Sequence, residues 1–474
     1  MSNNKKLVES ITSRDQDFAQ WYTDLCLKAE LMDYSDAKGF IIYRPLGYAI
    51  WEQIQKYLDL EFKKTGHQNV YMPLVIPESL FQKEKDHVEG FAPETAMVTT
   101  TGVEDLAERL IIRPTSEVLF GTHYSKIIQS HRDLPKKYNQ WCSVVRWEKN
   151  TRPFLRGKEF LWQEGHTVHA TAKEAKKETL DMLKIYERLG KDLLAIPFVT
   201  GRKTEREKFA GAKETYAIEA LMHDGQALQS GTSHYFGNEF AKAFDIKYTD
   251  ESNQIQYAYQ TSWGVSTRLI GALIMVHGDD NGLVLPPYVA PTQVVIIPIG
   301  TNPEVLYATK KLNKKLSKQF RTLVDDSKKT PGWKFAEYEM KGVPLRIEVG
   351  PRDLANGVVT IAFRHTHEKV LVKLEEVASF IKDGFKKMHT EMYEKAKAHA
   401  DAHTYTATSY DEFKTLIKKG GYIKMSISGE KAEEIIKAET GATARVILKG
   451  DLISEICPVT GKKAKQNVLF ARAY

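Results

Sequence analysis

The pattern of apolar and polar positions near the start of the chain predicts a helix followed by alternating strands and helices. Residues 13–16 resemble a helix capping box, and apolar side chains follow at helical spacing: Phe18, Trp21, Tyr22, Leu25 and Ala29. A turn at 36–39 leads to a strand-like run at 40–43, and a helix is expected over 48–64. The next strand, 69–77, contains prolines, which indicate a sheet edge or an interface.

The stretch from about residue 110 to 285 is expected to form strands with long helices between them. The patterns predict strands at 110–113, 141–148, 159–169 and 257–263, and helices at 171–194 and 265–277. Hairpin-like strand neighbours with segregated helices are typical of an α+β domain built on a largely antiparallel sheet.

The character of the chain changes at a proline-rich hinge, residues 286–291. The patterns that follow predict strands at 293–299, 322–325, 345–349 and 358–363, and helices at 303–320 and 332–340. This alternation describes a compact α/β domain with a mixed sheet. A long polar helix from 373 to about 399 leads to a tail that ends at Tyr474. We therefore expect three domains, over residues 1–287, 288–395 and 396–474, the last a small α+β domain.

Length and composition agree with a globular protein of roughly three domains. Of the 474 residues, 42% are hydrophobic and 27% are charged. Apolar runs such as 269–276 are far too short to cross a bilayer, and the N-terminus lacks an apolar signal core. The cysteines, Cys26, Cys142 and Cys457, are far apart in sequence, which argues against a disulfide framework and suggests a reducing cytoplasm.

The net charge of +7 is compatible with a nucleic-acid partner but does not identify one. Lysines crowd the segments 310–318 and 382–397. Two solvated helix faces explain these lysines as well as a nucleic-acid surface does.

The first candidate for chemistry is Arg146-x-Glu148, a loop, and then Arg156-x-x-x-Phe160. An arginine at a strand end can grip a phosphate with a planar fork of donors, a second arginine can reach further phosphates, and a phenylalanine can stack on adenine. The alternative is an antiparallel hairpin with a charged exposed face.

The second candidate is the segment 262–272, where a strand runs through small residues into an apolar helix with Arg268 in its first turn. Small residues let a nucleotide approach the backbone, and a helix N-terminus favours phosphate. A helix start with a surface arginine is the alternative, although an unpaired charge is costly to bury among apolar neighbours.

Taken in order, these segments resemble the three signature motifs of class II aminoacyl-tRNA synthetases. Motif 1 matches residues 44–47 (Arg-Pro-Leu-Gly), motif 2 the Arg146 to Phe160 pattern, and motif 3 residues 264–268 (Gly-Val-Ser-Thr-Arg). The segments 113–117, 160–166, 231–234 and 275–279 are further similar to prolyl-tRNA synthetases of the archaeal and eukaryotic-like type. The resemblance covers essentially the whole chain, including the order of a class II catalytic domain, an anticodon-binding domain and a C-terminal domain.

The resemblance implies the attachment of L-proline to tRNA(Pro) in two steps. Prolyl-adenylate and diphosphate form from ATP, and proline then passes to the 3′-terminal adenosine of the tRNA, with no enzyme nucleophile. The family pattern assigns the proline pocket to Thr115, Glu117, Arg146, Trp162, Glu164, His166 and His234. It assigns ATP binding to Arg146, Glu148, Arg156, Phe160, Gln229, Thr232, Ser266 and Arg268. Arg146 and Arg268 would be catalytic because they neutralise charge on the reacting phosphates. Mg²⁺ would accompany the ATP as a phosphate clamp.

Single members of these sets also have structural explanations. A lone histidine such as His166 is more often a satisfied structural residue, and Glu117 could cap a helix that begins after Pro114. Only the joint occurrence of the residues points to a substrate site.

Contacts to tRNA are assigned more loosely. Residues 289 to about 390 resemble the anticodon-binding domain of several class II enzymes, in which Glu348, Arg352, Asp353 and Arg364 are candidates for reading single-stranded bases. Phe91 and Glu94 would lie near the path of the tRNA end.

The chain departs from many relatives in its tail, where four cysteines usually bind zinc. Only Cys457 is present here, and Ser428, Glu433 and Thr460 stand at the other positions. A structural zinc site needs four ligands, so we expect no zinc. Only about 100 residues separate Phe160 from Trp263, which leaves no room for the editing domain of bacterial-type enzymes.

Other interpretations stay open. A class II enzyme for threonine, glycine or histidine would share the ATP motifs but differ around Thr115, Glu117 and His166. A tRNA-binding protein without catalysis would be expected to have lost Arg146, Arg156 or Arg268, which are all present. The motif 1 segment is further expected to form a homodimer interface.

Overall fold

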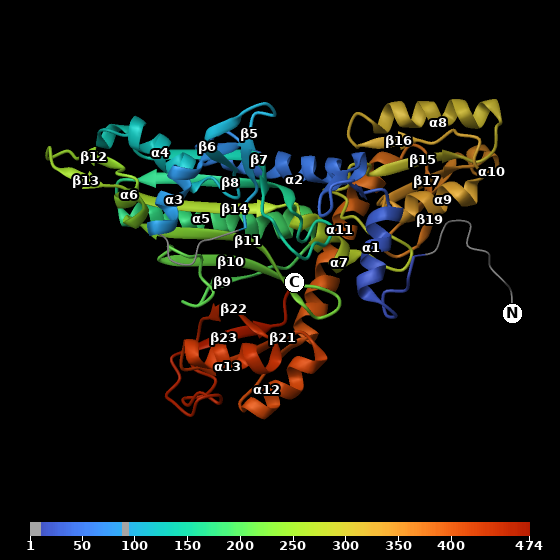
Figure 1. Cartoon of the computed structure of the whole chain (residues 1–474). Coiled ribbons are helices and arrows are strands. Elements are labelled where there is room, and N and C mark those ends of the chain that lie inside the picture. The colour runs from blue at the N-terminus through green and yellow to red at the C-terminus, as the bar shows by residue number, and fades with distance from the viewer. Residues whose placement is uncertain (1–10, 88–93) are drawn as a thin grey trace.

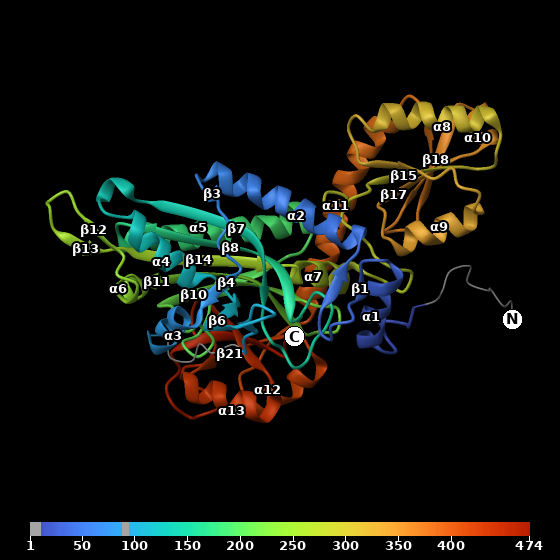
Figure 2. The same ribbon diagram turned by 45° about the horizontal axis from the view of Figure 1, so that its top comes forward.

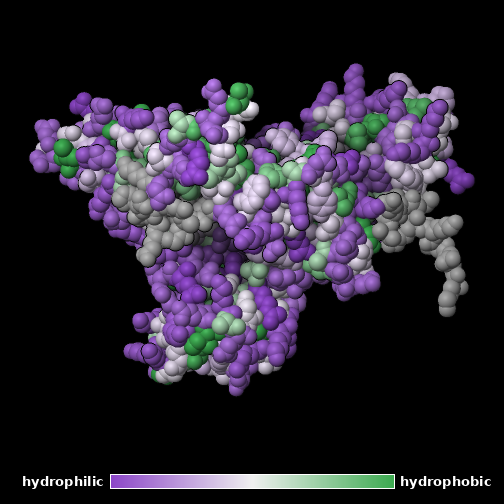
Figure 3. Space-filling view, in the orientation of Figure 1, coloured by the Kyte–Doolittle hydropathy of each residue, from purple (hydrophilic) through white to green (hydrophobic). Residues whose placement is uncertain are grey.

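The computed structural model describes residues 11–87 and 94–474, and three regions are visible in it (Figures 1 and 2). In the view of Figure 1, a large sheet with its helices occupies the left and centre, an α/β region lies at the right, and the C-terminal region lies below the large sheet. The face shown in Figure 3 is largely hydrophilic, and its hydrophobic side chains form small groups. In the two described ranges, none of the helices combines the length and apolar character that crossing a membrane requires.

The first helix, α1 (Phe18–Lys28), has the predicted apolar face but a different cap. The carboxylate of Asp17, and not the side chain of Ser13, accepts a hydrogen bond from the Gln20 amide at 3.0 Å. Ser13 instead lies in the preceding turn, where its carbonyl accepts from the amide of Gln16 at 3.1 Å. The predicted capping box is therefore wrong. The predicted apolar face is confirmed by the buried side chains of Trp21, Tyr22, Leu25 and Ala29.

A short hairpin and a long helix follow α1. Strands β1 (Met32–Tyr34) and β2 (Ile41–Tyr43) pair antiparallel, and α2 (Pro45–Lys64) starts directly after Arg44. The helix begins three residues earlier than predicted because proline, which lacks an amide hydrogen, is well suited to the first helical position.

The central sheet confirms the predicted antiparallel α+β architecture. Its strands are, in spatial order, β9 (Val199–Arg202), β10 (Glu214–Leu221), β11 (Ala227–Gly237), β14 (Tyr259–Ser266), β8 (Glu159–His169), β7 (Lys136–Val145) and β3 (Gln68–Asn69). Neighbours pair antiparallel except β3, which is parallel to β7.

Smaller elements surround this sheet. Strands β4 (Val75–Pro77), β6 (Asp105–Ile112) and β5 (Met97–Thr100) form a separate sheet, and β12 (Lys247–Thr249) pairs with β13 (Ile255–Tyr257). The short connecting helices are α3 (Glu78–His87), α4 (Glu117–Ile127), η1 (His131–Asp133), η2 (Gly190–Leu194) and α6 (Glu239–Ala243).

One face of the central sheet is covered by α2, α5 (Ala172–Leu189) and α7 (Arg268–His277), whose apolar residues share one core with Trp263 of β14. The Trp263 ring lies 4.9 Å from the ring of Phe62 on α2. A Cβ on Gly165 of the neighbouring strand would lie 2.1 Å from this indole, so only glycine fits there. Because side chains alternate along a strand, the residues next to Trp263 and Gly165 point to the other, open face.

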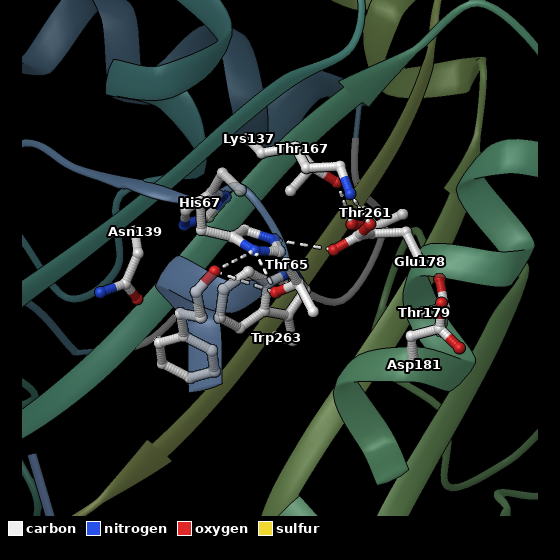
Figure 4. Close-up of polar contacts among 12 residues, drawn as sticks. Thr65, His67, Lys137, Asn139, Thr167, Glu178, Thr179, Asp181, Thr261 and Trp263 are labelled. Carbon is white, nitrogen blue, oxygen red and sulfur yellow. Dashed lines mark hydrogen bonds and ion pairs between the residues drawn. The ribbon is translucent and has the colours of Figure 1, made fainter. Parts of the chain in front are cut away.

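A buried polar network ties the turn after α2 to β7 and α5 (Figure 4). His67 Nε2 lies 2.7 Å from one carboxylate oxygen of Glu178, and Lys137 Nζ lies 2.6 Å from the other. Burial opposes ionisation of Glu178, but His67 and Lys137 outweigh it and lower its pKa to about 2. The His67 ring also packs edge-on against Trp263, with 5.0 Å between centroids.

The α/β region contains the predicted mixed sheet. Its strands are, in spatial order, β16 (Thr322–Val324), β15 (Val294–Pro298), β17 (Leu345–Val349), β18 (Val358–Phe363) and β19 (Lys369–Lys373). The first three are parallel and the last two pairings are antiparallel. Its helices are α8 (Pro303–Leu316), α9 (Pro331–Met340), α10 (Pro351–Ala355) and α11 (Val377–Ala402). The pattern analysis missed β19, a sheet-edge strand in which an apolar residue, Leu371, is exposed along with Lys369 and Lys373.

The C-terminal region extends the central sheet. Its elements are β20 (Thr404–Thr406), α12 (Tyr410–Leu416), η3 (Ile417–Lys419), β21 (Tyr422–Ile427), α13 (Glu430–Thr440), β22 (Thr443–Leu448) and β23 (Gln466–Ala471). Strand β22 pairs with β9 at Ile447 and Arg202, so these strands and the central sheet form one eleven-stranded sheet. Helix α11 crosses the expected boundary at residues 395 and 396 without a break (Figures 1 and 2). The division into residues 1–287, 288–395 and 396–474 stays a prediction.

Candidate active site

A cavity of about 290 Å³ opens on the face of the central sheet that the helices leave free. Most of the residues singled out from the sequence line it together: Thr115, Glu117, Arg146, Phe160, Trp162, Glu164, His166, Gln229, Thr232, His234, Ser266 and Arg268. Arg156 lines a neighbouring cavity that shares Phe160 with the first one. Glu148 lies beside Arg156, with Glu148 Oε2 3.9 Å from Arg156 Nε.

The strand pattern explains how β8 contributes three of these side chains. Trp162, Glu164 and His166 occupy alternate positions, so they share one face of the sheet. Their partners across β14 are the small residues Ser266, Gly264 and Ser262, in that order. The small residues of motif 3 therefore leave space above the strand, where a substrate can approach the backbone.

Carboxylates gather at one end of the cavity. The Thr115 hydroxyl donates to Glu117, and Glu164 accepts from Ser116 Oγ at 2.5 Å and from Gln140 Nε2 at 2.6 Å. His166 Nε2 lies 2.9 Å from the second oxygen of Glu164. Burial opposes ionisation of Glu164, but these partners outweigh it and hold its pKa below the usual value. The result is a fixed anionic wall that suits a cationic ligand.

His234 closes the same end as a neutral side chain. Its Nδ1 lies 3.0 Å from Thr215 Oγ1, and the ring packs 4.7 Å from that of Phe209. Burial, together with the charge on nearby His166, lowers the pKa of His234 to about 3. The ring is therefore uncharged at neutral pH and adds apolar surface to the pocket.

Arg146 stands between the carboxylates and the opposite end. Its guanidinium lies 5.5 Å from the ring of Phe160 and 5.4 Å from that of Trp162, and Nε donates to the Pro114 carbonyl at 3.0 Å. Burial lowers its pKa, while Glu117 and nearby carboxylates oppose that change. Two faces of aromatic rings fix the plane of this cation, and its outer donors point to the cavity it lines.

Arg268 lies at the other end and is held by main-chain oxygens. Its Nε donates to Leu155 at 3.2 Å, and Nη1 donates to Gln229 at 3.1 Å. Burial, together with repulsion from Arg146 and Arg156, lowers the pKa of Arg268 to about 10. The guanidiniums of Arg156 and Arg268, with that of Arg146 beside them, therefore make an electropositive region that favours a polyanion such as a chain of phosphates.

Sequence reasoning missed the residues that hold the others in place. Gln140 and Thr215 fix Glu164 and His234, and Phe209 packs on His234. No spacing in the sequence connects these pairs, because strand pairing brings them together. Ser116 differs from these three residues because it lies inside segment 113–117, which resembles the family. Its position in that segment could have identified it from the sequence.

The structure separates the residues expected to contact tRNA. Glu94 lies beside motif 2, where its carbonyl accepts from the Trp147 amide at 2.9 Å, whereas Phe91 lies outside the described residues. Arg352 is exposed on α10, Asp353 accepts from Thr360 at 2.9 Å, and Glu348 pairs with Arg346 and Lys369.

Arg364 has a different environment from the other candidates. It is 4% exposed and makes a bidentate pair with Asp279 at 2.8 and 2.6 Å, so it joins the α/β region to the segment after α7. Its Nε donates to the Glu339 carbonyl at 2.9 Å. This arrangement favours a structural role over a contact with bases.

The tail brings together three of the four positions where many relatives have cysteines. Ser428 Oγ lies 2.8 Å from Thr460 Oγ1, and hydrogen bonds led by that of Thr460 outweigh burial and lower the pKa of Cys457. Glu433 turns toward the central region and accepts from Thr204 at 2.8 Å. Burial raises its pKa to about 7. Among residues 11–87 and 94–474, no group of three or more His, Cys, Asp or Glu side chains suited to a metal ion is found.

Comparisons with known proteins agree with this geometry. Residues 99–277 match the class II tRNA synthetase core domain (G, H, P, S and T), residues 293–384 match an anticodon binding domain, and residues 410–474 match the prolyl-tRNA synthetase C-terminal domain. The proline–tRNA ligase of Aster yellows witches'-broom phytoplasma is 63% identical over 470 residues, covering 99% of both chains. That of Clostridium novyi is 59% identical over 478 residues and covers 100% of both. The resemblance seen in the motifs is thereby confirmed, and the chain belongs to the proline–tRNA ligase family of class II aminoacyl-tRNA synthetases.

Proposed function

We propose that this cavity activates L-proline with ATP and then transfers it to the 3′-terminal adenosine of tRNA(Pro). The observation that carries the proposal is the polarity of the cavity. Glu117 and Glu164 lie at one end, the guanidiniums of Arg156 and Arg268 lie at the other, and that of Arg146 lies between them. An amino acid with a cationic nitrogen and a nucleotide with anionic phosphates would bind in one orientation only.

The proline end would be read by charge and by apolar contact. Glu117 faces the secondary ammonium, and Glu164, held by His166, completes the anionic wall. Trp162 and neutral His234 offer flat surfaces to the hydrocarbon ring. Thr115 orients Glu117 through their hydrogen bond.

At the ATP end, Phe160 would stack on adenine, with Glu148, Gln229, Thr232 and Ser266 around the nucleoside. Arg156 and Arg268 would bind the outer phosphates. Class II synthetases use ATP with Mg²⁺, which neutralises phosphate charge when bound. Mg²⁺ would be held mainly by the phosphates of ATP and by water, with at most one or two carboxylates.

In the first step, an oxygen of the proline carboxylate attacks the α-phosphorus while the bond to diphosphate breaks. Arg146, between the two ends, would hold the carboxylate and the α-phosphate together and stabilise the charge that develops. In the second step, a ribose hydroxyl of the tRNA attacks the activated carbonyl and AMP leaves. Positioning and charge neutralisation carry both steps.

A homodimer is part of the proposal. Large apolar side chains are exposed in the segments that flank motif 1: Tyr34 is 56%, Ile42 54% and Tyr48 43% exposed. A second copy of the chain would cover this surface. Sedimentation should give twice the chain mass, and Ile42→Lys should reduce it. A monomeric wild type with full activity would remove the dimer from the proposal. A cytoplasmic location and contact between tRNA and Glu94, Glu348, Arg352 and Asp353 complete the proposal.

The test is ATP–diphosphate exchange measured with each of the twenty amino acids. Proline should give the dominant signal because of the charge and shape of the pocket. A stronger signal with threonine, glycine or histidine would favour another class II specificity. No exchange with any amino acid, by a protein that binds tRNA(Pro), would favour a role without catalysis.

A further inference from the structure

The loop between β7 and β8 contains Arg152, which lines the same cavity as Arg156 but belongs to neither the proline set nor the ATP set. The guanidinium of Arg152 lies between the rings of Tyr22 and Tyr474, 5.2 Å from each centroid. Its Nη2 is buried and has no hydrogen-bond partner in the part of the chain that the structure describes. The two ring faces hold this cation, and such desolvated contacts are strong.

The two tyrosines are themselves fixed by other segments. The Tyr22 hydroxyl donates to the carbonyl of Pro153, next to Arg152, at 2.7 Å. Tyr474, the last residue, donates its amide to the Ala227 carbonyl at 3.1 Å and its hydroxyl to Asp224. Figure 1 shows the C-terminus returning to the central sheet. Arg152 therefore lies in a slot formed by α1 and by the end of the chain.

The main chain at Arg152 is hydrogen-bonded to the main chain at Arg156. Its amide donates to the Arg156 carbonyl at 2.7 Å, and the Arg156 amide donates back at 3.0 Å. Between them, the Leu155 carbonyl accepts from Arg268 at 3.2 Å. A shift of Arg152 would move both Arg156 and the carbonyl that orients Arg268.

We infer that Arg152 is a positioning residue for ATP, and that Tyr474 couples the end of the chain to the motif 2 loop through it. The inference rests on the proposed function, since it assigns Arg156 and Arg268 to ATP phosphates. It predicts a selective effect. The carboxylate end of the cavity is built from α4 and β8, so proline binding should hardly change.

The experiment compares Arg152→Met, Tyr474→Ala and the double variant in proline-dependent ATP–diphosphate exchange. Arg152→Met keeps the apolar stem but removes the planar cation, and it should raise the KM for ATP about tenfold. The KM for proline should change less than about twofold. Tyr474→Ala should also raise the KM for ATP. The double variant should have a KM for ATP no higher than that of Arg152→Met, because both substitutions remove the same contact between Arg152 and Tyr474.

Lys149→Met is the matched control, since it lies on the same loop with a side chain that is 82% exposed. An unchanged KM for ATP in folded Arg152→Met, an equal rise for both substrates, or fully additive effects would overturn the inference. If Arg152→Met does not fold, Tyr474→Ala decides by the same criteria. Equilibrium dialysis with ATP alone separates the two proposals, because loss of ATP affinity in the variants supports this one even if another amino acid is activated.

Discussion

The carboxylate of Glu219 on β10 is bound by the guanidinium of Arg445 on β22, with Arg445 Nη2 2.9 Å from Glu219 Oε2. Lys203 Nζ lies 2.8 Å from the other carboxylate oxygen. Glu219 is fully buried and Arg445 is 6% exposed. The pair lies where the C-terminal strands join the central sheet, so the joint depends on charges that water does not reach.

We predict that Arg445→Ala destabilises the protein by about 3 kcal/mol, because Glu219 would keep its buried charge with Lys203 alone. The free energy of unfolding in urea measures the loss. Arg206→Ala is the control, since Arg206 pairs with Glu434 across the same joint but both side chains are partly exposed. This exposed pair should contribute less than about 1 kcal/mol. Equal losses in the two variants would contradict the role given to burial.

Much of this architecture could be predicted from the sequence, but the joint could not. The apolar periodicity of α1 and the strand-like run of β8 were enough to predict a helix and a strand. The side chains that either element buries recur at a fixed spacing in the local sequence. The pairing of Ile447 with Arg202 joins strands more than two hundred residues apart, and no local pattern records which strands meet. Motif residues such as Arg146 were likewise predicted from the sequence. Gln140 and Thr215 were missed because they belong to no motif and act only by holding other side chains in place.

The second prediction concerns the two central arginines. Arg146→Ala and Arg268→Ala should each slow adenylate formation by on the order of 3 kcal/mol, about a hundredfold, because each removes a donor from developing phosphate charge. Exchange kinetics at saturating proline and ATP measure this loss. Arg132→Ala, an exposed residue in the middle of η1, is the control. Exchange near the wild-type rate would exclude the substituted arginine from the active site.

A third prediction is that stability falls between pH 7 and pH 5. Burial lowers the pKa of His277 from 6.5 to about 4 and that of His234 to about 3. The unfolded chain then binds more protons, so stability is complete above pH 6.5 and is lost as the pH falls toward these values. Each histidine should cost about 2 kcal/mol at pH 5.

Urea unfolding at several pH values tests this with His277→Asn. His277 lies 2.9 Å from the Leu194 carbonyl, outside the substrate cavity. Between pH 7 and pH 5, the free energy of unfolding should fall by about 2 kcal/mol less in the variant than in the wild type. An identical slope for His277→Asn would show that this ring is charged as readily in the folded protein as in the unfolded chain.

The fourth prediction is that the purified protein holds less than one tightly bound zinc per chain. Ser428 and Thr460 are hydrogen-bonded to each other at 2.8 Å beside Cys457, and hydroxyls are poor substitutes for thiolates. Elemental analysis after dialysis measures the metal. As a positive control, the Ser428→Cys, Glu433→Cys and Thr460→Cys triple variant should gain about one zinc. Stoichiometric zinc in the wild type would refute the alignment of the tail.

The last prediction concerns alanine. A pocket shaped for a five-membered ring cannot exclude a smaller side chain by size, and lost apolar contact discriminates by only about 1–3 kcal/mol per methylene. Between β8 and β14, the chain is used by α5, strands β9 to β11 and the β12–β13 hairpin, with no segment left for an editing domain. We therefore expect alanine-dependent exchange at high alanine concentration and no hydrolysis of alanyl-tRNA(Pro). Incubation of pre-formed alanyl-tRNA(Pro) with the enzyme tests this, with Arg146→Ala as a control for contaminating esterases. Rapid deacylation by the wild type, faster than without enzyme, would reveal a hydrolytic site in this chain.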